Sequence, residues 1–234
     1  MPDLLVHDLG LLGYAEALEL QRAAARARIS GTLHEDLLLL VEHPPVVTLG
    51  RSSKDGHLIA TPSHLASRGV KLFEVERGGD VTFHGPGQLV GYPIIDLKRH
   101  RQDLHWYLRK VEETLIRGLA SLGIAAERRE KLTGVWVNDR KIGSIGVHAR
   151  DWVTWHGFAL NVNTDLQFFD LIVPCGISGV EMTSVARELD HEVSMSDART
   201  AMAAAVAEVF DLRTTPIMRD DFETLIGIRE SAAV

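Results

Sequence analysis

Cysteine is nearly absent from this 234-residue chain, which has one, Cys175. A single thiol excludes disulfides within the chain and any zinc or iron–sulfur site built from cysteines alone. Positive charge is also scarce, with 25 Lys and Arg against 32 Asp and Glu. A nucleic-acid binder needs a basic surface, so this balance argues against nucleic acid as a partner. The single free thiol fits a reducing, cytoplasmic setting.

Long apolar runs are missing as well. The apolar run at 37–41 is bounded by charged residues on both sides, whereas a membrane-spanning helix needs about 20 apolar residues. The first residues lack the basic start and the apolar core of a signal peptide. We therefore expect no membrane span, no export signal and a cytoplasmic location.

The composition that remains is that of an ordinary globular protein. Hydrophobic residues make up 45% of the chain and charged residues 24%, which is enough apolar material for a sizeable core. No repeat or linker divides the chain. We expect one domain over residues 1–234, with a possible small helical C-terminal portion over 190–234.

Hydrophobic periodicity predicts alternating strands and helices. The expected strands are 4–7, 36–41, 46–49, 70–75, 89–95, 135–137, a glycine-bearing segment from 141 onward, and 154–162. The expected helices are 13–29, 62–67, 103–122, a helix capped by Ser194 that runs to 210, and 222–226. The apolar stripe of the 103–122 helix predicts a core element that carries no chemistry.

Several familiar catalytic motifs are absent. The 11 histidines are scattered and include no His-Glu-x-x-His, so we expect no metal site. Residues 143–146 lack the Gly-x-Ser-x-Gly spacing of a serine hydrolase. The glycine-rich stretch 77–88 has neither dinucleotide-binding nor Walker spacing, and is either a ligand-facing loop or a pair of tight turns.

Cysteine chemistry remains. Pro174 and Gly176 flank Cys175, and this pairing fixes the backbone before the thiol and frees it afterwards. The simpler interpretation is a buried packing cysteine. A nucleophilic thiol needs a basic neighbour. The candidates are Lys141, His84, His148 and His156, and the pattern alone leaves the choice open. For the lysine, a solvated position at a sheet edge is the simpler interpretation.

Four blocks of sequence occur in a familiar order: 42–51, 77–88, 141–146, and 156–163 leading into 174–176. Together they resemble the lipoyl(octanoyl) transferase family, over roughly residues 4–215. Phe83 occupies a position that is often tyrosine in this family. The resemblance implies an α+β, biotin/lipoate protein ligase-like fold, in which helices pack on one side of a mixed β-sheet.

The resemblance also implies an activity. Cys175 would take an octanoyl group from octanoyl-acyl carrier protein as a thioester and pass it to a lysine of a lipoyl domain, in lipoate biosynthesis. Lys141 would be the acid/base that keeps the cysteine reactive. No cofactor is implied. The expected partners are octanoyl-acyl carrier protein and the lipoyl domains of 2-oxoacid dehydrogenases and of the glycine cleavage H protein.

The resemblance maps substrate contacts onto three segments. These are Arg77, Gly78, Gly79, Asp80, Val81, Thr82, Phe83 and His84; Ser144, Ile145 and Gly146; and Gly157, Phe158 and Ala159. We further expect the acyl chain to lie in an apolar channel lined by Phe83, Leu160 and Val162. Acidic protein substrates predict a basic rim made of Arg51, Arg77, Arg140, Lys141 and Arg150.

Two other functions fit the same residues. An ATP-dependent lipoate–protein ligase on this fold would use Lys141 against an acyl-adenylate, although the Pro-Cys-Gly loop disfavours it. A non-catalytic module that binds lipoyl domains or acyl chains would need no reactive thiol. Transfer without nucleotide separates the first alternative from an acyltransferase, and turnover separates the second.

Overall fold

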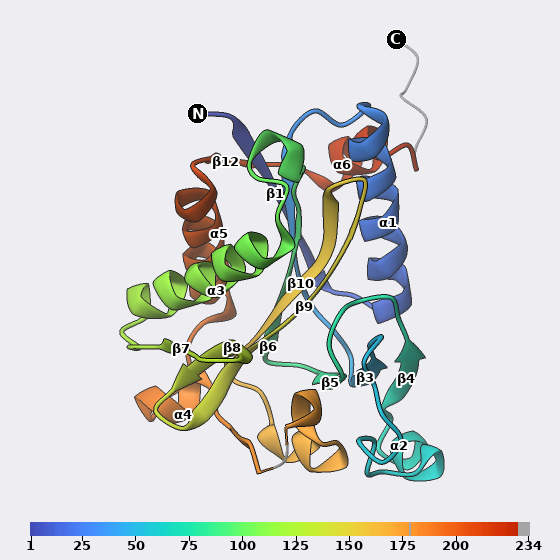
Figure 1. Ribbon diagram of the computed structural model, residues 1–234, viewed down its shortest axis with the longest axis vertical. Helices are drawn as coiled ribbons and strands as arrows, with labels where there is room; N and C mark the ends of the chain where they lie inside the picture. The colour runs from blue at the N-terminus through green and yellow to red at the C-terminus, as the bar shows by residue number, and fades with distance from the viewer. Residues whose placement is uncertain (178, 229–234) are drawn as a thin grey trace.

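Two β-sheets form the frame of the molecule in a computed structural model that describes residues 1–177 and 179–228. Within this part of the chain, the main sheet has nine strands in the order β12-β1-β2-β6-β10-β9-β8-β7, with β11 beside β9. A smaller sheet has the order β4-β3-β5. In Figure 1 the small sheet and α2 lie at the lower end of the molecule, below the long strands of the main sheet.

The element bounds are as follows. The strands are β1 (Asp3–Leu11), β2 (Asp36–Glu42), β3 (Val46–Leu49), β4 (Lys71–Glu74), β5 (Val81–His84), β6 (Gln88–Ile94), β7 (Glu127–Arg129), β8 (Leu132–Val137), β9 (Arg140–Arg150), β10 (Val153–Asn161), β11 (Glu181–Met182) and β12 (Arg213–Pro216). The helices are α1 (Tyr14–Ser30), α2 (Pro62–Ser67), α3 (Leu104–Ser121), α4 (Val185–Leu189), α5 (Met195–Phe210) and α6 (Arg219–Leu225).

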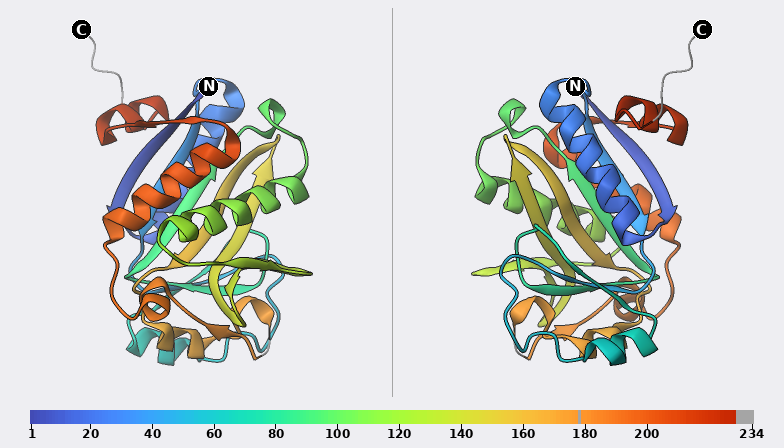
Figure 2. Two further views of the ribbon diagram at one scale, coloured as in Figure 1. Left: turned by 90° about the vertical axis from the view of Figure 1, so that its left-hand side faces the viewer. Right: turned by 90° about the vertical axis from the view of Figure 1, so that its right-hand side faces the viewer.

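Helices cover both faces of the main sheet. Strand β2 is apolar on both sides: Leu38 and Leu40 pack into the core beneath α3 and α5, while Leu37 and Leu39 pack into the core beneath α1. Figure 2 shows α3 and α5 in front in one view and α1 in front in the other. The α+β fold with a mixed sheet is confirmed, but the expectation of helices on one side is wrong. A strand with two apolar faces needs cover on both.

The helix starts follow the capping rules. Asp103 accepts a hydrogen bond from the Trp106 N–H at 3.0 Å at the start of α3. Thr61 caps α2, which has Pro62 at its first position. Ser194 caps α5 by accepting from the Ser196 N–H at 3.2 Å. Each cap satisfies a backbone donor that the first helical turn leaves free.

The glycine-rich stretch 77–88 contains a strand that the sequence did not predict, β5. Strand β5 pairs antiparallel with β3 in the small sheet. Gly78 donates its N–H to the Val147 carbonyl of β9 at 2.8 Å, which joins this stretch to the main sheet. This bond holds the small sheet against β9.

Residues 190–228 are built into the same architecture. Strand β12 runs parallel to β1, with Asp3 opposite Arg213. Helix α5 packs closely on α3, where a side chain at Gly118 would meet the Met202 side chain. In the part of the chain that the structure describes, no helix is long and apolar enough to cross a membrane.

The core beneath α3 gives a direct test of this packing. Leu119 on α3 is fully buried, while Leu104 at the start of the same helix is 41% exposed. We expect Leu119→Ala to lower the free energy of unfolding by about 2–5 kcal/mol, because it leaves a cavity in the core. Leu104→Ala should lower it by less than about 1 kcal/mol. Urea unfolding measures both changes. Equal losses of stability would contradict the burial of Leu119 and the exposure of Leu104 on α3.

Candidate active site

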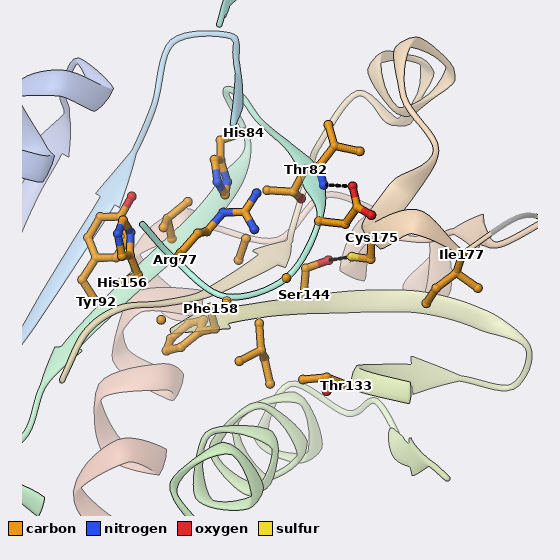
Figure 3. A pocket seen from close by; sticks show the side chains of 18 of the residues that line it. Arg77, Thr82, His84, Tyr92, Thr133, Ser144, His156, Phe158, Cys175 and Ile177 are labelled. Atoms are coloured by element: carbon orange, nitrogen blue, oxygen red, sulfur yellow. Dashed lines mark hydrogen bonds between the residues drawn. The ribbon is translucent and has the colours of Figure 1, made fainter. Parts of the chain in front are cut away.

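A cavity of about 250 Å³ lies between the small sheet and the centre of the main sheet. Twelve of the residues predicted to contact substrate line it, together with Cys175. They are Arg77, Gly79, Asp80, Val81, Thr82, His84, Ser144, Ile145, Gly146, Gly157, Phe158 and Ala159. In Figure 3, Cys175 and Ser144 lie toward one end of the cavity and Tyr92 and His156 toward the other. Three separate segments of the chain therefore converge on one space.

Two predicted contacts, Gly78 and Phe83, are not on the cavity wall. Phe83 is buried on the opposite side of β5, where it stacks on Phe168 with ring centroids 4.7 Å apart. Its neighbours Thr82 and His84 line the cavity, because side chains alternate along a strand. Gly78 acts through its backbone, which bonds to β9. Neither residue lies on the wall of this cavity, and their contact with substrate stays a prediction.

Cys175 occupies a short 3-10 turn, Pro174–Gly176, with φ 55° and ψ 20°. This left-handed conformation costs a residue with a side chain about 1–3 kcal/mol, and such strain concentrates at functional positions. The thiol is half-buried and faces the cavity. A side chain on Gly176 would approach the Asp80 carboxylate within 2.5 Å, so a glycine after the thiol is required for this turn to pack.

The Asp80 carboxylate lies beneath the Cys175 turn. Its Oδ2 lies 2.7 Å from His57 Nδ1, and its Oδ1 accepts the Val81 N–H at 2.7 Å. Both carboxylate oxygens thus have partners although the side chain is buried. The turn packs on this hydrogen-bonded carboxylate, which holds the turn in place beside β5.

Lys141 is completely buried on β9. Its Nζ donates to the Thr133 carbonyl at 3.0 Å and to Cys175 Sγ at 3.1 Å. The ammonium also lies 5.4 Å from the centre of the Trp136 ring. Solvation at a sheet edge, the simpler interpretation of this residue, is therefore wrong.

No carboxylate forms an ion pair with Lys141 among residues 1–177 and 179–228. Burying an ammonium without a counter-charge costs several kcal/mol. Cys175 is the neighbour within hydrogen-bond distance whose side chain can become an anion. The Lys141 amine and the Cys175 thiol therefore form one buried hydrogen-bonded pair.

The structure distinguishes among the four candidate bases. Lys141 contacts Cys175 Sγ, and Ser144 Oγ lies 3.8 Å from the same sulfur. His84 bonds instead to Gln88 at 2.7 Å, and His148 packs against Trp155 with ring centroids 4.2 Å apart. His156 lines the cavity, but its Nε2 has no hydrogen-bond partner. Among the described histidines, none bonds to the thiol.

The inner end of the cavity is closed by buried aromatic and histidine side chains. His43 bonds to the Leu12 carbonyl through Nδ1 and to the Tyr92 hydroxyl through Nε2, both at 2.7 Å. Because a carbonyl only accepts, Nδ1 carries the proton and Tyr92 donates to Nε2. Burial lowers the pKa of His43 to about 4 and that of His84 to about 3. Burial also raises the pKa of Tyr14 to about 12. These groups are neutral at pH 7.

Sequence reasoning missed several residues of the cavity wall. They are Tyr14, Val90, Tyr92, Lys131, Leu132, Thr133 and Ile177. Tyr14 and Tyr92 read as ordinary core positions on a helix and a strand, and nothing in their spacing distinguishes a cavity wall from a filled core. Only the pairing of distant strands brings them together.

Two further expectations concern the acyl channel and the basic rim. Leu160 and Val162 belong to the core on the α3 face of the sheet and, like Phe83, do not line the cavity. The basic rim is also wrong in part, because Arg77 and Lys141 are buried. Arg77 donates to the Thr48 carbonyl at 2.7 Å and to the Gly78 carbonyl at 3.0 Å, so its guanidinium supports the glycine-rich loop.

Comparison with known proteins places this chain in a family. Residues 13–207 match the model of the lipoyl protein ligase A/B catalytic domain. The chain belongs to this family. Among its similar relatives, the octanoyltransferase of Chloroflexus aggregans is 49% identical over 216 residues, which is 91% of this chain and 97% of that protein. The octanoyltransferase of Rubrobacter xylanophilus is 52% identical over 202 residues, with 86% and 90% covered.

Solved structures confirm the family's fold. The putative lipoate protein ligase Ta0514 of T. acidophilum has a TM-score of 0.76 at 18% identity, covering 97% of this chain and 93% of that one. The biotin protein ligase of Aquifex aeolicus, in complex with biotin and ATP, has a TM-score of 0.53 at 10% identity, covering 90% and 71%. The biotin/lipoate protein ligase-like architecture expected from the sequence is thus confirmed.

The buried histidine behind the cavity predicts sensitivity to acid. The pKa of His43 is about 4 in the folded protein and about 6.5 in an unfolded chain. Below pH 6.5 the unfolded chain therefore binds a proton that the folded one does not. His43 alone should lower the free energy of unfolding by about 2 kcal/mol between pH 7 and pH 5.

Urea unfolding at these two pH values checks this expectation. His43→Gln should flatten the dependence of stability on pH, whatever it does to stability at pH 7. His105→Gln is the control, since His105 is exposed on α3, and it should leave the dependence unchanged. Equal slopes in all three proteins would show that His43 is not held neutral.

The Cys175 turn gives a second prediction. Gly176 and Gly179 both have positive φ, 68° and 75°. A side chain at Gly176 would collide with Asp80, whereas one at Gly179 meets nothing within 4 Å. Both alanine variants carry backbone strain, but only Gly176→Ala should also displace the thiol. We expect Gly176→Ala to slow alkylation of Cys175 by iodoacetamide at least about tenfold more than Gly179→Ala does. Equal rates would contradict the packing of the turn on Asp80.

Proposed function

We propose that this chain is an octanoyltransferase that carries the octanoyl group as a thioester on Cys175. Its relatives across most of its length are octanoyltransferases, and this supports octanoyl transfer in lipoate biosynthesis. The observation that carries the covalent route is the 3.1 Å contact between Lys141 Nζ and Cys175 Sγ at one end of the cavity. The donor is octanoyl-acyl carrier protein. The acceptor is a lysine of a lipoyl domain, in 2-oxoacid dehydrogenases and the glycine cleavage H protein.

The first half-reaction moves the acyl group to the enzyme. The Cys175 thiolate attacks the carbonyl carbon of the donor thioester, a new C–S bond forms, and the bond to the carrier thiol breaks. The Lys141 ammonium gives its proton to the departing carrier thiolate. Exchange of one thioester for another is nearly balanced in free energy, so this step needs no nucleotide. A covalent intermediate divides the transfer into two easier steps.

The second half-reaction releases the product. The ε-amine of the lipoyl-domain lysine attacks the acyl-enzyme, a C–N bond forms, and the bond to Cys175 breaks. Lys141, neutral after the first step, takes the proton that the amine loses. The thiolate and the ammonium are thereby restored together. Because the product is an amide and the intermediate a thioester, this step is downhill.

The cavity suits a short saturated acyl chain. Apolar side chains of Val90, Ile145, Phe158 and Ala159 line it, and each buried methylene contributes about 0.8 kcal/mol. The lining also includes Gly79, Gly146 and Gly157, which have no side chains to fill the cavity. We propose that the lining residues predicted from the sequence contact the octanoyl group and its thioester. The cavity receives the acyl chain while the two protein substrates approach from outside in turn.

Intact-mass measurement tests the covalent route. After incubation with octanoyl-carrier protein and without an acceptor, the enzyme should gain the mass of one octanoyl group. Cys175→Ser should show no such gain. Its side chain has the same shape, so the turn should keep its conformation. An enzyme that turns over lipoyl domains without ever showing the adduct would overturn the thioester.

Lys141→Met tests the proton carrier, because methionine fills a similar buried volume without charge. We expect the rate of acyl-enzyme formation to fall by about 10²–10⁴-fold, with a melting temperature within a few degrees of the wild type. A parallel loss of rate and stability would assign Lys141 a structural role. Transfer that depends on ATP would instead support a ligase, and tight acyl binding without turnover would support a binding module.

A further inference from the structure

We propose that Glu112, on α3, is a positioning residue for Lys141 and acts through the backbone of β8. The proposal rests on the proposed role of Lys141 beside Cys175. The sequence assigned this helix to the core, with no part in chemistry. A carboxylate that is 1% exposed is unusual on such a helix, because burying a charge is costly unless several donors compensate it.

Three donors surround the Glu112 carboxylate. Oε2 accepts from Arg109 NH1 at 2.7 Å and from Arg128 Nε at 3.1 Å. Oε1 accepts the backbone N–H of Gly134 at 3.3 Å. The two arginines reach the carboxylate from the surface side. The third bond points inward, to the strand that passes Lys141.

Gly134 is in direct contact with Lys141. A side chain on Gly134 would lie 2.6 Å from Lys141 Cε and 3.0 Å from its Nζ. The residue before it, Thr133, supplies the carbonyl that accepts from Lys141 Nζ at 3.0 Å. Thr133 C=O and Gly134 N–H belong to the same peptide unit, which is planar and rigid. A hydrogen bond to the N–H therefore also fixes the carbonyl that holds the ammonium.

The contacts form one continuous connection, from Glu112 through the 133–134 peptide to Lys141 and then to Cys175 Sγ. Gly134 has φ 127°, a backbone conformation that glycine can adopt but that glycine by itself does not enforce. The strand pairing of β8 with β9 is irregular beside it, between Val135 and Trp136. Without an external anchor this peptide could rotate, and the ammonium would lose one of its two hydrogen-bond acceptors. Glu112 supplies that anchor.

Glu113 provides a matched control on the next position of α3. It contacts Arg128 and Arg117 and is partly exposed, but it makes no bond to β8. Glu113→Gln should weaken the surface ion pairs and leave Gly134 bound. Glu112→Gln keeps an oxygen that can accept from Gly134, whereas Glu112→Leu removes it. Glu112→Asp keeps the charge but shortens the side chain by one methylene.

Alkylation of Cys175 by iodoacetamide, followed between pH 5 and pH 10, gives a readout that needs no acyl substrate. It reports the reactivity of the thiol that Lys141 contacts. We expect Glu112→Leu to shift the profile to higher pH and to slow alkylation at pH 7 about tenfold, toward the behaviour of Lys141→Met. Glu112→Gln should stay within about twofold of the wild type, and Glu113→Gln should be unchanged. Should Glu112→Leu fail to fold, Glu112→Asp should show the same shift.

A lower melting temperature in Glu112→Leu with an unchanged alkylation profile would overturn the proposal, since Glu112 would then only join α3 to β7. A shift in Glu113→Gln as large as that in Glu112→Leu would overturn it too, because surface charge alone would then explain both. If Lys141→Met itself left the profile unchanged, the Lys141–Cys175 pair would fail and this proposal with it. A normal effect of Lys141→Met combined with no effect at Glu112 would reject only the positioning role.

Discussion

The contact between the buried Lys141 side chain and the Cys175 thiol is the constraint on which this site depends. Lys141 has no access to solvent and no carboxylate partner among the described residues. Its hydrogen bonds go to one carbonyl and one sulfur. Burying a polar amine with so few partners is costly, so the two hydrogen bonds help to hold the side chain in this position.

The rest of the fold keeps these two groups at contact distance. Lys141 comes from the middle of the main sheet, whereas Cys175 comes from a turn supported by Asp80 at the edge of the small sheet. Glycines make the approach possible where β8, β9 and the 77–79 loop pass one another, because side chains there would overlap with neighbouring backbone. Gly78 and Arg77 then hold the loop to β9 and β3. The cavity is the space that this assembly leaves open.

Much of this arrangement was predictable from the sequence. Local signals located nearly all of the long elements, because capping residues such as Asp103 and apolar runs such as β2 act over a few residues. The order of the motif blocks led to Cys175 and Lys141. The sequence could not show that α1 covers the second face, since this depends on how strands far apart pair. The sequence also gave no sign of strand β5, which lies in a glycine-rich stretch. It predicted that Phe83 contacts substrate, although the alternation of side chains along β5 turns the Phe83 ring away from the cavity.

Other residues were placed wrongly for the same reason, because the sequence does not show tertiary contacts. Leu160 and Val162 are apolar and near the motif, yet they face the helix side of the sheet, so hydrophobicity alone did not identify the channel. Arg77 carries a charge that suggested the surface, but a backbone carbonyl and a threonine satisfy it inside. Glu112 was overlooked because a helix with an apolar stripe gives no sign that one polar residue on it is buried. In each case the role of the residue depends on the residues that it contacts in the folded protein.

Cys175 lies in a turn that packs beside the small sheet, whereas Lys141 is on β9 of the main sheet, and this has a consequence for how the contact between them could be lost. A fluctuation that lifts the small sheet from β9 would separate the pair while leaving most of the hydrophobic core intact. Cys175 would then lose its contact with Lys141 before the molecule unfolded. The reactivity of the Cys175 thiol should therefore report whether the small sheet is packed against β9.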